Sequence, residues 1–199
     1  MNSPQDLRRL GGMLCLDFIN TLDWRGRPKP DEYLCSYENL LEWGVLAGAL
    51  TQGQSHRLRR SVTKAVAAKA LRCAVAFREA AHRLLKAMVE SAKPQTDDVR
   101  HVSGMIAKAR SHEILSYERG TLTWSLLDTE RDPQLVLWIV SLSFADLLTS
   151  ERLRCVRECG GPECGWFFID ATKNHQRRWC SMDGCGNRAK ARRFYARIR

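Results

Sequence analysis

Apolar residues recur along much of the chain with the spacing of an amphipathic α-helix. The clearest case is residues 60–92, where no glycine or proline interrupts the sequence and where Phe77, Ala81, Leu84 and Leu85 fall at intervals of three and four. The same stretch is rich in alanine, leucine, arginine and lysine, which favour helix. It therefore predicts one long helix that turns an apolar stripe toward a core.

Three further segments carry helical signals, and one stretch between them does not. Helices are expected over residues 37–50, 97–109 and 135–148, and the last is apolar nearly all round, which predicts a central position in the core. Residues 113–116 and 121–126 instead have the composition of two short strands joined by a hairpin turn. The N-terminal part is therefore expected to be mainly α with a small β-hairpin.

Charged residues are distributed unevenly between the two parts of the chain. The 199 residues carry a formal net charge of +10. Residues 151–199 contain twelve Lys and Arg against five Asp and Glu, whereas residues 1–150 contain twenty against seventeen. We therefore predict two domains, a helical one over residues 1–150 and a small module over 151–199. A basic end on a nearly balanced body is typical of nucleic-acid binding, although a solubilising tail would have the same composition.

No segment has the length or composition of a membrane span or a secretory signal. The longest apolar stretch, residues 135–148, falls short of the roughly 20 residues that cross a bilayer, and it contains Ser141, Ser143 and Asp146. We therefore expect a cytoplasmic protein without a membrane partner. In that reducing compartment the eight cysteines are not expected to form disulfides.

Four of the cysteines form two pairs with matching spacing. Four residues, including at least one glycine, separate Cys159 from Cys164, and four also separate Cys180 from Cys185. Such pairs are typical of a zinc ribbon or treble clef, in which four thiolates hold Zn²⁺ in a tetrahedron and leave no position for a catalytic water. Cys155, four residues before Cys159, is an alternative to Cys159 as the first ligand.

The cysteines and their neighbours resemble the CGNR zinc-finger family. The resemblance rests on CGGPECGWFFID at 159–170, RRWCSM at 177–182 and CGNRAK at 185–190. Upstream, LCLDFINT at 14–21, with Leu40 and Trp43 in the following helix, resembles the ABATE domain, a mostly helical domain with a β-hairpin that precedes this finger. Together the two resemblances cover nearly the whole chain, and they imply a transcription regulator with a role in the stress response.

The chain ends in a predicted amphipathic helix that starts near Gly186. At 100° per residue, four apolar side chains form one stripe: Ala191, Phe194, Tyr195 and Ile198. We expect this stripe to dock on the zinc hairpin or on the helical domain.

Basic residues flank the stripe on both sides, and no acidic residue follows Asp183 to neutralise them. We expect these cations and two before them to contact the phosphates of nucleic acid, in particular duplex DNA. The expected contacts are Arg177, Arg178, Arg188, Lys190, Arg192, Arg193 and Arg197. Arg188 has an alternative structural role in bonding backbone carbonyls, and Asn187 could cap the helix or donate to a sulfur.

Three functions are compatible with these features. The first is a DNA-binding transcription regulator whose helical domain senses a small-molecule effector or forms a homodimer. The second is a zinc-stapled protein-interaction module. The third, a small-molecule enzyme in the N-terminal domain, is disfavoured because the sequence has no phosphate loop and no nucleophile elbow, and its five histidines show no ligand spacing. We therefore do not expect an enzyme.

One polar pair stands out inside a strongly apolar segment of the N-terminal part. Asp17 and Asn20 are three residues apart, which places them on one helical turn. With Trp24 they could line a pocket for a small ligand. The alternative is that they cap a helix.

Overall fold

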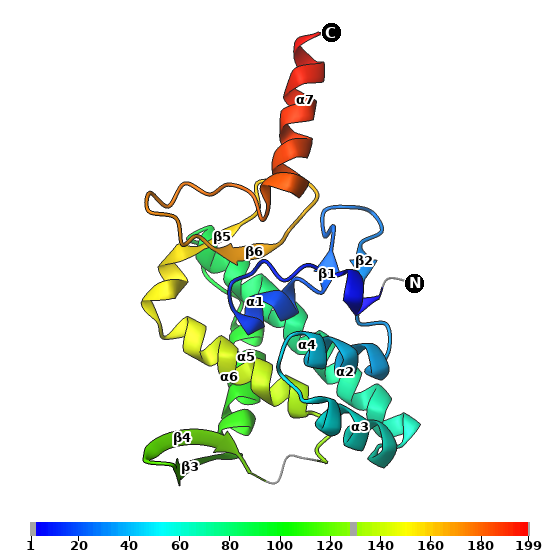
Figure 1. The fold of residues 1–199 in the computed structure, drawn as a ribbon. Coiled ribbons are helices and arrows are strands. Elements are labelled where there is room, and N and C mark those ends of the chain that lie inside the picture. Colours follow the sequence, from blue (N-terminus) through cyan, green and yellow to red (C-terminus); the bar gives the residue numbers. More distant parts are fainter. Residues whose placement is uncertain (1–2, 128–130, 199) are drawn as a thin grey trace.

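The computed structural model describes residues 3–127 and 131–198, and the fold class is the predicted one, mainly α with small hairpins (Figure 1). The helices are α1 (Leu14–Ile19), α2 (Tyr37–Leu46), α3 (Gln52–Ser61), α4 (Lys64–Val89), α5 (Thr96–Arg110), α6 (Leu135–Leu148) and α7 (Asn187–Arg197). Short 3-10 turns lie at Pro4–Asp6 and Glu151–Cys155, and a π-helical turn lies at Met182–Gly186. The antiparallel strand pairs are β1 (Leu22–Asp23) with β2 (Asp31–Glu32), β3 (Glu113–Glu118) with β4 (Thr121–Leu126), and β5 (Val156–Glu158) with β6 (Phe167–Ile169). None of the helices within the described residues is long and apolar enough to cross a membrane.

The long helix predicted over residues 60–92 is α4, but it begins only at Lys64, and α3, which was not predicted, lies just before it. α3 ends at Ser61, Val62 is extended, and the Thr63 side chain accepts a hydrogen bond from the Val66 N–H at the start of α4. The predicted start at Arg60 was wrong because threonine is a good N-cap and a poor residue for a helix interior. Apolar periodicity alone does not detect such a break.

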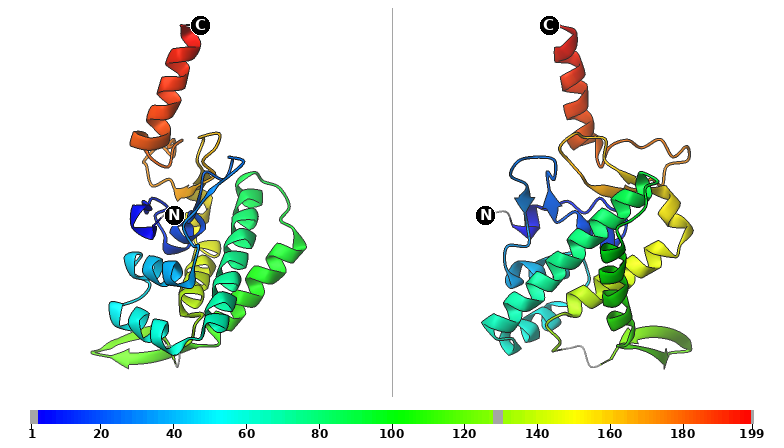
Figure 2. Two further views of the ribbon diagram at one scale, coloured as in Figure 1. Left: turned by 90° about the vertical axis from the view of Figure 1, so that its right-hand side faces the viewer. Right: turned by 180° about the vertical axis from the view of Figure 1, so that it is seen from behind.

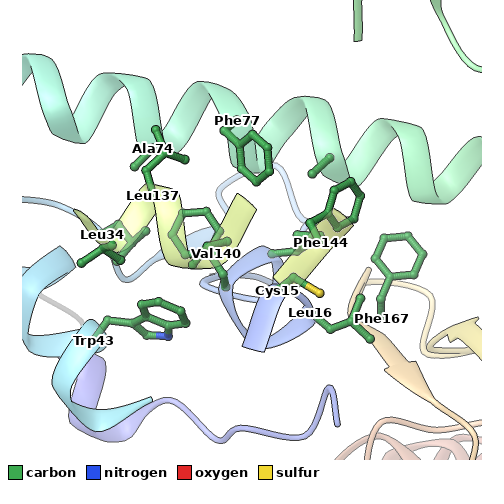
Figure 3. Packing of buried hydrophobic residues seen from close by; sticks show 14 of the residues in the cluster. Cys15, Leu16, Leu34, Trp43, Ala74, Phe77, Leu137, Val140, Phe144 and Phe167 are labelled. Atoms are coloured by element: carbon green, nitrogen blue, oxygen red, sulfur yellow. The ribbon is translucent and has the colours of Figure 1, made fainter. Parts of the chain in front are cut away.

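α6 lies at the centre of the helical body, as its apolar sequence predicted. It packs against α1, α2 and α5, and its Phe144 meets Phe77 of α4 edge to face, with 5.9 Å between the ring centres (Figure 3). The same buried cluster continues into Phe167 and Phe168 of β6. Because the core runs past residue 150, the division of the chain into two domains at that point stays a prediction.

The β3–β4 hairpin is the one that the sequence predicted, and it lies at the end of the molecule remote from α7 (Figures 1 and 2). In its register, Leu115 is opposite Trp124 and Tyr117 is opposite Leu122. The side chains of β4 are exposed up to Ser125. The hairpin therefore adds little to the core of the body.

Candidate metal centre and basic helix

The first cysteine pair lies in the tight loop between β5 and β6. Cys159 directly follows β5, and its N–H donates to the Trp166 carbonyl at 2.8 Å, which closes the loop. The Cys164 N–H donates to the Gly161 carbonyl at 3.0 Å. A side chain on Gly161 would place its Cβ 3.2 Å from the Cys185 sulfur, so glycine lets the loop wrap closely around the thiols.

The second pair is carried by the segment that leads into α7. The Cys180 N–H donates to the Cys159 sulfur at 3.3 Å. Cys185 lies in the π-helical turn, which begins where the Ser181 hydroxyl accepts a hydrogen bond from the Gly184 N–H at 3.0 Å. α7 therefore starts directly from the cysteine cluster.

The four thiols form a closed tetrad. The sulfurs of Cys159, Cys164, Cys180 and Cys185 all lie within 4.8 Å of one another, and all four residues are buried. The sulfur–sulfur distances are 3.8 Å for Cys164 to Cys180 and 3.6 Å for Cys180 to Cys185. A tetrahedron with zinc–sulfur bonds of about 2.3 Å has edges of about 3.8 Å, so the cluster fits a structural zinc module.

The protonation of these thiols also favours a bound cation. Hydrogen bonds from Cys164 and Cys180 lower the pKa of the Cys159 thiol, whereas donation to Cys159 raises the pKa values of Cys164 and Cys180. The close packing of these three sulfurs therefore disfavours their simultaneous ionisation. A divalent cation removes this conflict because it stabilises all four negative charges.

Cys155 does not take part in the tetrad. It is half-buried, and its carbonyl accepts a hydrogen bond from the Asp170 N–H at 2.8 Å. The structure thus brings Cys159, and not its alternative, together with the other three cysteines.

Asn20 fastens the helical body to the strand beside the metal centre. Its buried side-chain amide accepts from the Phe167 N–H and donates to the Phe167 carbonyl, both at 2.9 Å. Asp17 accepts from the Gly11 N–H at 2.8 Å. Both side chains of the polar pair are therefore used in structural hydrogen bonds, and a single sequence does not reveal the partner of Asn20 because it lies 147 positions away.

The loop after β1 docks on the first cysteine pair, which the sequence did not indicate. The backbone N–H groups of Arg25 and Gly26 donate to the carbonyls of Cys164 and Glu163, at 3.3 and 3.1 Å. A Cβ on Gly26 would lie 2.8 Å from both the Glu163 Cα and the Pro162 carbonyl oxygen. The Arg25 guanidinium also pairs with Glu79 of α4 at 2.7 Å. This loop therefore links α4 to the metal centre.

A small cavity lies between this loop and the cysteine tetrad. It has a volume of about 210 Å³, and its lining includes Asp23, Trp24, Trp166 and Arg188 together with three of the cysteines. Two guanidinium groups lie over the Trp24 ring, those of Arg27 at 3.6 Å and Arg188 at 4.3 Å. Of the three residues predicted to bind a ligand, Trp24 lines this cavity and the polar pair does not.

Two of the arginines predicted to contact nucleic acid make contacts within the finger, although the Arg188 side chain stays exposed. Arg177 donates to the carbonyls of Trp179 and Cys180, and its guanidinium lies 4.2 Å from the Phe168 ring centre. Arg188 donates to the Cys185 sulfur at 3.3 Å. Arg188 thus has a structural role, although its partner is a thiol where backbone carbonyls were expected.

The other predicted contacts are exposed around the start and along the length of α7. They are Arg178, Lys190, Arg192, Arg193 and Arg197. The acidic residue nearest to them in sequence, Asp183, lies 4.0 Å from Arg8 of the helical body. These five side chains therefore form a cationic surface on the finger, which we call the α7 cationic surface.

The apolar stripe of α7 does not dock as expected. Phe194, Tyr195 and Ile198 are each 64–65% exposed, and α7 extends away from the body in all three views (Figures 1 and 2). The prediction was wrong because amphipathic spacing defines a face of a helix but not what covers it. The direction of α7 is set by the turn that holds Cys185.

Comparison with known protein families matches two consecutive segments of the chain. The ABATE family model, described as "Putative stress-induced transcription regulator", matches residues 12–151. The model of the CGNR zinc finger matches residues 155–198. A search of curated proteins finds no match.

Proposed function

This chain belongs to the ABATE family and ends in a CGNR zinc finger, and from that membership we propose that it is a transcription regulator that binds duplex DNA. The α7 cationic surface carries the proposal. Four of its exposed side chains, Lys190, Arg192, Arg193 and Arg197, stand on a helix that projects from the body, and the fifth, Arg178, lies in the segment before that helix. Such a concentration of positive charge suits a partner with many negative charges.

In this proposal the zinc ion acts as a structural element. Cys159, Cys164, Cys180 and Cys185 supply four thiolates, so the coordination shell is complete without water. An ion held there would supply structure and no reaction chemistry. Cys185 would tie the start of α7 to it, and the hydrogen bond from Arg188 to the Cys185 sulfur links the first turn of the helix to the same site. Arginines on such a preordered frame lose less side-chain freedom when they bind phosphate.

The contacts proposed for DNA are with phosphates. A planar guanidinium bonds a phosphate through two parallel hydrogen bonds, which suits Arg192, Arg193 and Arg197. Lys190 and Arg178 add charge on the same surface. Phosphate contacts carry no base identity, so the proposal concerns affinity and leaves sequence preference aside.

The test is a salt series with duplex DNA. If about five phosphates are neutralised, the log–log slope of affinity against salt should be about −4 to −5. Arg192→Ala combined with Arg193→Ala should flatten the slope by about two, while zinc stays bound. A matched control, Lys64→Ala with Lys69→Ala, removes two exposed charges from α4 and should leave the slope unchanged.

Two outcomes would contradict DNA binding. One is no binding at low salt, and the other is equal slopes for wild type and the Arg192/Arg193 variant. The α7 surface would then serve another partner, and the zinc-stapled protein-interaction module would be the better description.

The helical body is proposed to sense a small molecule or to dimerise. For sensing, the cavity at Trp24 is the relevant site because it adjoins Arg188 and three of the cysteines, so an occupant would touch the base of α7. The dimerising role rests on a different surface, the β3–β4 hairpin.

A further inference from the structure

The β3–β4 hairpin exposes a continuous apolar face. Leu115, Tyr117, Leu122 and Trp124 alternate along the two strands and therefore point to the same side of the hairpin. Their exposed fractions are 52, 72, 62 and 66%. On the opposite side, the hydroxyl groups of Ser116 and Ser125 form a hydrogen bond of 3.1 Å. The hairpin thus turns its polar side and its apolar side alike to solvent.

A hairpin of this kind is stabilised when another surface packs against its apolar side. A two-stranded sheet alone in water is at best marginally stable. Among the residues that the structure describes, the hairpin is held mainly at its base, where the Leu127 N–H donates to the His112 carbonyl at 2.8 Å. The four apolar side chains expose on the order of 500 Å² together, which is as large as the largest patch on a typical monomer and is typical of an interface.

We propose that the apolar face of β3–β4 is covered by the same face of a second copy of this chain. The register makes the face complementary to itself. The two aromatic residues, Tyr117 and Trp124, lie on one diagonal, and the two leucines lie on the other. A two-fold axis between two stacked hairpins, whether along or across the strands, therefore places each aromatic ring against a leucine of the partner.

Charge also selects a second copy for this surface. The one charged residue on this side of the strands within residues 113–117 and 121–127 is Glu113, whose carboxylate pairs with Arg110 at 3.0 Å. Two copies of a protein with a net charge of +10 can therefore meet there with little local repulsion. The exposed stripe of α7 differs, because Lys and Arg flank Phe194 and Tyr195 on both sides. Contact through the hairpins also leaves the α7 cationic surface uncovered, since α7 is at the other end of the molecule.

The area sets the expected strength of this dimer. Two such faces bury about 1,000 Å², which is near the lower limit for a specific interface. Association should therefore be reversible, with a dissociation constant on the order of micromolar. It does not depend on DNA binding, because it uses the opposite end of the molecule.

The test is analytical ultracentrifugation of the zinc-loaded full chain without DNA. Between about 1 and 100 µM, the wild-type mass should rise from 22.7 kDa toward twice that value. Tyr117→Ser with Trp124→Ser should remain monomeric at every concentration. The matched control, Phe194→Ser with Tyr195→Ser, removes two aromatic rings of similar exposure from α7 and should dimerise like wild type.

A second measurement uses only the wild-type protein, so it does not depend on correct folding of the hairpin variant. Amide hydrogen exchange of the wild-type protein should slow in residues 113–126 as concentration rises and stay constant in α7. A wild-type protein that is monomeric at 100 µM, or a hairpin variant that still dimerises, would overturn the proposal. Neither result would bear on DNA binding, which the salt series measures separately.

Discussion

The two longer strand pairs among the described residues, β5–β6 and β3–β4, differ in how far neighbouring elements bury them. β5–β6 pairs only three residues per strand, yet Phe167, Phe168 and Ile169 of β6 are all buried. β3–β4 pairs six residues per strand, yet its apolar face is exposed. The longer hairpin is thus the less covered one. The comparison shows that burial by neighbouring elements, and not the number of paired residues, decides whether a small sheet belongs to the core.

Three kinds of contact hold β5–β6 in the core. Its aromatic side chains join the core of the helical body, Asn20 satisfies the backbone of Phe167, and the cysteine tetrad closes the loop between its strands. β3–β4 has no such neighbours among the described residues beyond its base. The following predictions test this difference, from the largest expected effect to the smallest.

Removal of one thiol should separate the contribution of the metal from that of the core. We expect Cys185→Ser to abolish binding of zinc, which contributes about 10 kcal/mol or more to the folding of small modules of this kind. The segment from Lys173 through α7 should lose order, while β5–β6 stays packed because its aromatic residues belong to the shared core. Elemental analysis and hydrogen exchange measure the two effects.

The control for this experiment is Cys155→Ser, which should keep one zinc per chain because Cys155 lies outside the tetrad. Full zinc retention by Cys185→Ser, or zinc loss from Cys155→Ser, would show that the ligands are not the four proposed.

Truncation of one aromatic residue in each hairpin tests the comparison directly. Phe167 is completely buried, so Phe167→Ala should lower the free energy of unfolding by about 3–5 kcal/mol. Trp124 is 66% exposed, so Trp124→Ala should change it by about 0.5 kcal/mol or less. Urea denaturation at concentrations where the chain is monomeric provides both values. Similar losses for the two variants would mean that the hairpins do not differ in cover.

Removal of the Asn20 amide should weaken the attachment of β6. Asn20→Ala leaves the Phe167 N–H and carbonyl buried without partners, which should cost about 2–4 kcal/mol of unfolding free energy. Asn174→Ala is a suitable control, since Asn174 is exposed in the loop of the finger and its removal should change stability by about 0.5 kcal/mol or less. Indistinguishable denaturation curves for the two variants would refute the role assigned to Asn20.

Acid should loosen the same junction through His82. Burial lowers the pKa of His82 from 6.5 to about 4, and its ring lies 5.0 Å from that of Phe167. Because the unfolded chain takes up this proton at a higher pH than the folded chain, stability falls as pH decreases from about 6.5 toward 4. The loss between pH 7 and pH 5 should be about 2 kcal/mol.

His82→Gln isolates this effect from protonation of the thiols, because the variant keeps a hydrogen-bonding side chain near the Gly165 carbonyl but does not titrate. Its stability should decline less than that of wild type between pH 7 and pH 5, as followed by urea denaturation at each pH. Parallel declines in the two proteins would contradict the prediction.

Local patterns in the sequence were sufficient for much of this description. The periodicity of apolar residues located most helices, the strand composition located β3–β4, and the spacing of the cysteines indicated a zinc module. Each of these signals depends on residues that are close in sequence, where backbone geometry relates spacing directly to position in space. The break at Thr63 is also a local signal, which the periodicity masked.

Only the tertiary structure decided how the polar residues are used. Asn20 hydrogen-bonds the backbone of Phe167, which lies 147 positions away in the sequence. Arg177 donates its hydrogen bonds to carbonyls of the finger, whereas the adjacent Arg178, the same residue type, is exposed. The same holds for apolar faces, since alternation in β3–β4 and periodicity in α7 define a face and do not state what covers it. The physical reason is that hydrogen bonds and apolar contacts between distant segments depend on where the whole chain places them, and residue spacing carries no information about that placement.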